Sequence, residues 1–166
     1  MRIAGVVHGV PFANAAHGNF IQFFDEKDKL HIVLKVRGEQ CDGVLFLRTH
    51  RPYSCAEIFW LRDNKNPWGY DTVLEFPDAM LISKEFSRLP NGHAPNKGDL
   101  IIHPDGSLML LSGAHSCARY VDMKTGKIAL PNAEATPSLV VSRWAIAVPT
   151  DNATTSLVEF PAPDLQ

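Results

Sequence analysis

Hydrophobic residues recur along this chain in short runs separated by turn-forming residues, a pattern typical of β-strands. Residues 30–37 show it most clearly: one apolar set alternates with a second set that includes two basic residues and a histidine. The first set is Leu30, Ile32, Leu34 and Val36, and the second is His31, Val33, Lys35 and Arg37. This period of two predicts a strand that buries the first set.

Other segments give similar signals. Strands are predicted at residues 2–8, 19–24, 43–48, 56–62, 139–142, 143–148 and 156–160. The polar run 25–29 predicts a hairpin loop whose carboxylates, Asp25 among them, are solvated. Residues 78–86 fit a helix with Asp78 as N-cap and a strand equally well.

Residues 98–130 predict an antiparallel meander. Four strands are expected there, at residues 100–103, 107–112, 117–122 and 127–130. Pro104-Asp105-Gly106 and Lys124-Thr125-Gly126 supply two of the turns, and a loop centred on His115 supplies the third. Glycine gives these turns a positive φ, and the Asp and Thr side chains cap the turn backbone.

The meander resembles one blade of a WD40-like or YVTN-like β-propeller. The resemblance rests on Asp105-Gly106 at the inner hairpin and on residues 122–127, Asp-Met-Lys-Thr-Gly-Lys, at the outer one. Residues 19–61 could form a second, degenerate blade. The fold expected is therefore all-β, with an antiparallel meander arranged as a small or incomplete propeller, and a β-sandwich as the alternative.

Length and composition suit a single domain. The chain has 166 residues, 45% hydrophobic and 20% charged, and we expect one all-β domain at 1–160 with a flexible tail at 161–166. The net charge of −2 without a basic cluster argues against nucleic acid, and no apolar run reaches the ~20 residues of a membrane helix. Three cysteines without paired spacing favour free thiols, with one disulfide and one free thiol as the alternative. We expect a cytoplasmic protein, or a periplasmic one if a signal peptide has been removed.

Candidate chemistry is sparse. His115 and Cys117 could form a nucleophilic pair, alone or with His103 or His50, although buried structural use of Cys117 is the simpler interpretation. Metal ligation could use two sets without paired zinc spacing: His93, His103, His115 and Cys117, or Cys41, His50 and Cys55. No nucleotide-binding, hydrolase or metalloprotease motif is present, so we expect no cofactor, no resident metal and no catalytic residue.

Aromatic residues favour a binding role. Phe59, Trp60 and Trp144 are candidate anchors, although Phe59 and Trp144 are better explained as core residues. Trp68 and Tyr70 lie in an Asn-Pro-Trp-Gly-Tyr turn, and Trp68 is the tryptophan expected to be most exposed. These aromatic residues also leave open an alternative to protein binding, in which they line a pocket that binds a small ligand.

The same meander also resembles a small group of bacterial immunity proteins with an incomplete propeller fold. These proteins block peptidoglycan-cleaving amidase effectors of the type VI secretion system with a Ser-Gly-Ser-Ser loop. Here Ser112-Gly113 opens the loop, but Ala114-His115 replaces the paired serines, and Ser116 follows. The resemblance implies a non-enzymatic protein-binding module, an immunity or inhibitor protein, that contacts an effector toxin through Ser112, Gly113, Ala114, His115 and Ser116. The aromatic chemistry of Trp68 and Tyr70 adds these two residues as further expected contacts.

Overall fold

The computed structural model describes most of the chain, with several gaps. The described residues are 8–50, 54–63, 66–68, 71–87, 95–103, 107–113, 118–129, 139–150 and 153–160. The expected strand at 2–8 (apart from His8), the Pro104-Asp105-Gly106 turn and the tail at 161–166 therefore lie outside them. No helix in the described ranges is long and apolar enough to cross a bilayer.

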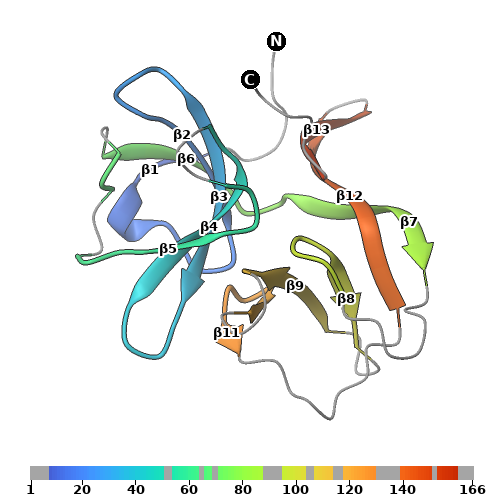
Figure 1. Ribbon diagram of the computed structural model, residues 1–166. Helices are drawn as coiled ribbons and strands as arrows, with labels where there is room; N and C mark the ends of the chain where they lie inside the picture. Colours follow the sequence, from blue (N-terminus) through green and yellow to red (C-terminus); the bar gives the residue numbers. More distant parts are fainter. Residues whose placement is uncertain are drawn as a thin grey trace.

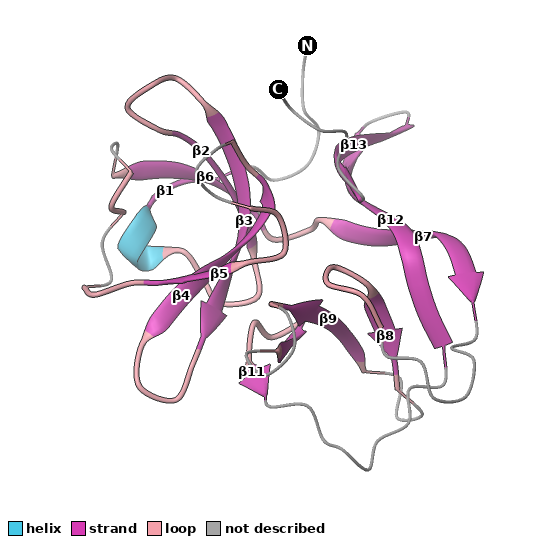
Figure 2. Ribbon diagram, in the orientation of Figure 1, coloured by secondary structure: helices cyan, strands magenta, loops and turns pink. Residues whose placement is uncertain are grey.

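The described residues form thirteen β-strands and one short 3-10 helix (Figure 2). The all-β, antiparallel expectation is confirmed. Within the segment 78–86, which fitted helix and strand equally, Asp78 lies in a turn and residues 80–86 belong to strand β7. The elements are β1 (His8–Pro11), η1 (Phe12–Asn14), β2 (Phe20–Phe24), β3 (Leu30–Arg37), β4 (Asp42–Arg48), β5 (Ile58–Trp60), β6 (Thr72–Phe76), β7 (Met80–Ser87), β8 (Leu100–Ile102), β9 (Leu108–Ser112), β10 (Arg119–Asp122), β11 (Ile128–Ala129), β12 (Leu139–Thr150) and β13 (Ala153–Phe160).

The strands form two antiparallel sheets (Figure 1). Sheet A has the order β1-β6-β2-β3-β4-β5, and sheet B the order β11-β10-β9-β8-β12-β13, with β7 on the other edge of β12. Each sheet contains a meander of four consecutive strands, β2 to β5 and β8 to β11, as the sequence predicts. Two differences appear: β6 was not predicted, and residues 139–148 form one strand instead of two.

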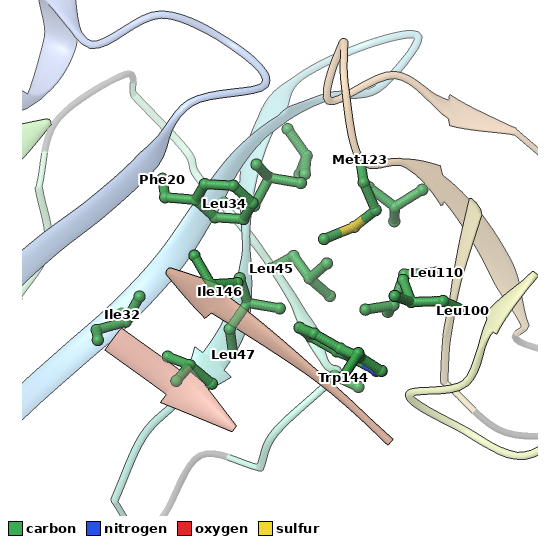
Figure 3. Packing of buried hydrophobic residues seen from close by; sticks show 14 of the residues in the cluster. Phe20, Ile32, Leu34, Leu45, Leu47, Leu100, Leu110, Met123, Trp144 and Ile146 are labelled. Atoms are coloured by element: carbon green, nitrogen blue, oxygen red, sulfur yellow. The ribbon is translucent and has the colours of Figure 1, made fainter. Parts of the chain in front are cut away.

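The largest hydrophobic core lies between the two sheets (Figure 3). Sheet A contributes Phe20 of β2 and Ile32, Leu34 and Val36 of β3. Sheet B contributes Leu100, Leu110 and Trp144. Trp144 is fully buried as expected, donates its indole N–H to the Gly98 carbonyl at 2.9 Å, and stacks on Phe160. The sheets therefore face each other, an arrangement compatible with a sandwich and with propeller blades alike.

Strand β3 differs from the prediction of one buried and one exposed face, because both of its faces are buried. Val33 belongs to a second core on the far face of sheet A, where η1 and the segment around Leu61 and Trp68 cover the sheet. His31 and Lys35 are each only 1% exposed. The prediction that β3 buries only its first set was wrong because covering segments distant in sequence shield the second face too.

Lys35 is accommodated on that face by hydrogen bonds to the helical turn. Its Nζ donates to the carbonyls of Phe12 at 3.1 Å and Ala13 at 3.0 Å, and the ammonium lies 5.4 Å from the Phe12 ring centroid. Burial lowers the pKa of Lys35, against the opposing influence of Asp42 and Glu75. The side chain thus ties η1 to sheet A at the cost of a buried charge.

The turn between β10 and β11 joins the two sheets. Asp122 accepts the Lys124 N–H at 2.8 Å and the Thr125 hydroxyl at 2.6 Å, as the turn chemistry predicts. Gly126 has a φ of +67° and accepts the Arg37 N–H of β3 at 2.8 Å. The Thr-Gly turn of the sequence motif therefore also makes a backbone contact between sheet B and β3.

Candidate functional site

A groove at the rim between the sheets is the clearest candidate site. It has a volume of about 380 Å³. Sheet A supplies the β3–β4 turn, residues 38–41, and Trp60; sheet B supplies Arg119, Ile128 and Ala129. Ile58 and Ile128 pack against the main core from either side, so the groove is the open edge of the space that this core fills.

Trp60 forms a rigid wall of this groove. Alternation along β5 puts Trp60 on the same face as Ile58, toward sheet B. The indole lies against the backbone of two glycines: a Cβ added at Gly38 would come within 2.7 Å of the ring, and one at Gly43 within 3.2 Å. Since Trp60 is nevertheless 42% exposed, part of a firmly supported indole faces solvent.

Arg119 brings a positive charge to the opposite wall. It is half-buried at the start of β10, and its Nη1 donates to the Ala118 carbonyl at 2.9 Å. A guanidinium carries five N–H donors, so most of its donors remain available. No ion pair involves Arg119 in the described part of the chain. Glu39 and the free thiol of Cys41 are exposed on the turn that faces it.

Two residues of the predicted binding loop, Ser112 and Gly113, are described by the structure, and Ser112 pairs with a residue of the groove. Ser112 ends β9, is only 3% exposed, and stands opposite Arg119 in the β9–β10 pairing. Gly113, with a φ of +78°, donates its N–H to the Ala56 carbonyl just before β5. Ala114, His115 and Ser116 lie outside the described residues, as does Cys117.

Trp68 is not the exposed anchor that its turn suggested. It is only 6% exposed, stacks on Phe23 at 5.4 Å, and makes edge contacts with Phe46 and Phe59. The backbone N–H of Trp68 donates to Asn66 Oδ1 at 3.1 Å, so the turn directs the indole into the second core. Tyr70 lies outside the described residues. Trp60 is the tryptophan that the fold leaves accessible.

A carboxylate–imidazole–hydroxyl array occurs elsewhere in sheet A. His31 Nε2 is 3.2 Å from Asp25 Oδ2, and His31 Nδ1 is 2.9 Å from Thr49 Oγ1. Burial lowers the pKa of His31, whereas Asp25 opposes that shift. Asp25 is thus only partly solvated, contrary to expectation. The imidazole and hydroxyl are 1% and 7% exposed, so the array fastens the β2–β3 loop to the end of β4.

The cysteines and histidines do not assemble a metal centre within the described ranges, where no group of three or more His, Cys, Asp and Glu comes together. Cys41, His50 and Cys55 therefore do not form the proposed ligand set. Burial raises the pKa of the Cys55 thiol, which disfavours a reactive thiolate there. His93 and His115 lie outside the described residues, and His103 contacts the Tyr120 ring.

The sequence alone could have found part of this site. Trp60 is among the candidate aromatic residues, but Arg119 and the turn at 38–41 carry no motif, because they meet only when the two sheets pack.

Comparison with models of protein families, with curated proteins and with solved structures gives no match.

Proposed function

We propose that this protein is a non-enzymatic protein-binding module that engages its partner at the Trp60 groove. The observation that carries the proposal is the supported, 42% exposed indole of Trp60. Tryptophan is enriched among residues that dominate binding energy. An indole already held by Gly38 and Gly43 loses little conformational freedom when a partner covers it.

The predicted loop extends this surface. Gly113 of this loop donates its N–H to the Ala56 carbonyl, in the segment that leads into β5, and Arg119 of the groove follows the loop in the sequence. The loop residues Ala114, His115 and Ser116 stand between these two points in the sequence, and the proposal is that they also contact the partner. The resemblance to immunity proteins suggests the specific form of this hypothesis: an inhibitor whose loop enters the catalytic cleft of a bacterial effector toxin.

A small ligand is the second candidate occupant. The groove volume of about 380 Å³ falls within the range of small-molecule sites, about 300–1,000 Å³. The exposed Trp60 ring could stack on such a ligand. Ligand-induced thermal stabilisation of the isolated protein would favour this candidate.

Affinity capture with matched aromatic variants tests the protein-binding proposal. Trp60→Ala removes the groove wall, and Phe24→Ala is the control because Phe24 is 47% exposed and does not line the groove. We expect one stoichiometric partner to bind wild type and Phe24→Ala equally. Trp60→Ala should weaken binding of the purified partner by about 30-fold, the loss typical of a hot spot.

His115→Ala examines the loop in the same experiment. Weaker binding by this variant would support loop insertion, whereas unchanged binding would restrict the interface to the groove. A partner that binds Trp60→Ala as tightly as wild type would contradict the proposal, as would the absence of any stoichiometric partner.

A further inference from the structure

We propose that the groove recognises a protein segment in which an acidic residue stands beside an apolar side chain. Arg119 would bind the carboxylate, and Trp60 would cover the apolar group. This inference rests on the proposed function and adds the chemistry of the partner segment.

The argument for a carboxylate starts from a comparison with two other cations of sheet B, on β7 and β12. On the rest of sheet B, Lys84 pairs with Glu159 at 2.6 Å and Arg143 with Glu85 at 2.8 Å. Arg119, by contrast, has only the Ala118 carbonyl as an acceptor in the described part of the chain. A planar guanidinium with free N–H groups binds a carboxylate through two parallel hydrogen bonds. A carboxylate is therefore the complement of this wall.

The apolar argument comes from the remaining lining. Trp60, Ile128 and Ala129 surround the space that Arg119 borders, and Trp60 and Ala129 are exposed. A segment that places a carboxylate on Arg119 puts the adjacent side chain against this surface. An apolar neighbour would remove water from both itself and the indole.

Glu39 narrows the choice of anion. It is exposed on the β3–β4 turn in the same groove, and it would repel further negative charge brought next to Arg119. A polyanion such as nucleic acid would bring several phosphates into this space. The groove therefore suits a single carboxylate on an otherwise uncharged segment.

A peptide array provides the test. Immobilised seven-residue peptides carry a central Glu next to Leu, Phe or Trp, and matched peptides carry Gln in place of Glu. Labelled full-length protein is applied as wild type, Arg119→Gln, Trp60→Ala and Arg143→Gln. Arg143→Gln is the charge-matched control, since Arg143 is exposed and lies outside the groove.

We expect wild type and Arg143→Gln to prefer Glu peptides over Gln peptides by about 10-fold or more, the difference typical of a hydrogen-bonded charge. Arg119→Gln should lose this preference, and Trp60→Ala should bind both series weakly. Equal binding of Glu and Gln peptides by wild type, a preference that persists in Arg119→Gln, or no peptide binding would overturn the inference. So would free glutamate or single-stranded DNA that competes as well as the best peptide.

The captured partner separates this inference from the proposed function. A partner lost by Trp60→Ala but bound unchanged by Arg119→Gln supports the proposed function and overturns the acidic-segment inference. A partner indifferent to both variants overturns both. Where an acidic residue of the partner is implicated, Arg119→Glu should abolish binding, and a Glu→Lys change in the partner should restore it.

Discussion

Substituting Gly126 by alanine should destabilise the fold through the joint between the two sheets. Gly126 adopts a φ of +67°, and a Cβ there would lie 2.5 Å from the Lys35 carbonyl oxygen and 2.6 Å from the Gly18 nitrogen. Both are backbone atoms on the sheet A side, so no side-chain rotation can relieve the contact. The alanine must displace either the Thr-Gly turn or β3.

Two effects add to give the magnitude. An L-residue in the left-handed region costs about 1–2 kcal/mol. Forcing an extra carbon into a packed contact costs about 1–3 kcal/mol. Gly126→Ala should therefore lower the free energy of unfolding by about 2–5 kcal/mol.

Gly9→Ala is the matched control for this prediction. The nearest atom to a Cβ at Gly9 is the Thr72 Cγ2 at 3.8 Å, and its φ is not left-handed. We expect a change within about 1 kcal/mol, the size of an alanine-for-glycine effect in a strand. Urea unfolding followed by tryptophan fluorescence measures both variants. A difference between them below about 1 kcal/mol would refute the claim that Gly126 forms a close joint between the sheets.

Three further predictions concern buried charge and exposure. Burial lowers the pKa of His31, so below pH 6.5 the unfolded protein binds more protons than the folded protein. The stability of the wild type should therefore fall as the pH is lowered through that window. His31→Gln should show a smaller fall, measured by urea titrations at several pH values. The lowered pKa of Lys35 predicts that the free energy of unfolding rises as the pH approaches 10.5 in the wild type but not in Lys35→Met. The same dependence of stability on pH in both proteins would contradict this. Trp60 should account for most acrylamide quenching, since Trp68 and Trp144 are 6% and 0% exposed, and Trp60→Ala that leaves quenching unchanged would refute the assignment.

The candidate site shows where inference from the sequence ends. Trp60 and Trp68 are eight positions apart, both near turn residues, and no local pattern distinguishes their exposure. The way the two faces of sheet A are covered decides which indole is exposed. Trp68 closes the second core, whereas Trp60 faces the open edge of the main core. Arg119 could not be singled out, because its significance depends on its place in the groove opposite Trp60, which follows only from the packing of the two sheets.

The amino-acid sequence by itself determined most of the strands, the antiparallel order of the meander at residues 98–130 and the turn at residues 122–127. These features depend on alternation and on contacts a few residues apart, such as the Asp122 side chain with the Thr125 hydroxyl. Only the tertiary structure decided that β3 is buried on both faces, that Gly126 joins the sheets, and that Trp60 and Arg119 line one groove. The physical reason is that burial and proximity between distant segments follow from how two sheets pack, and a linear pattern of polarity does not contain that information.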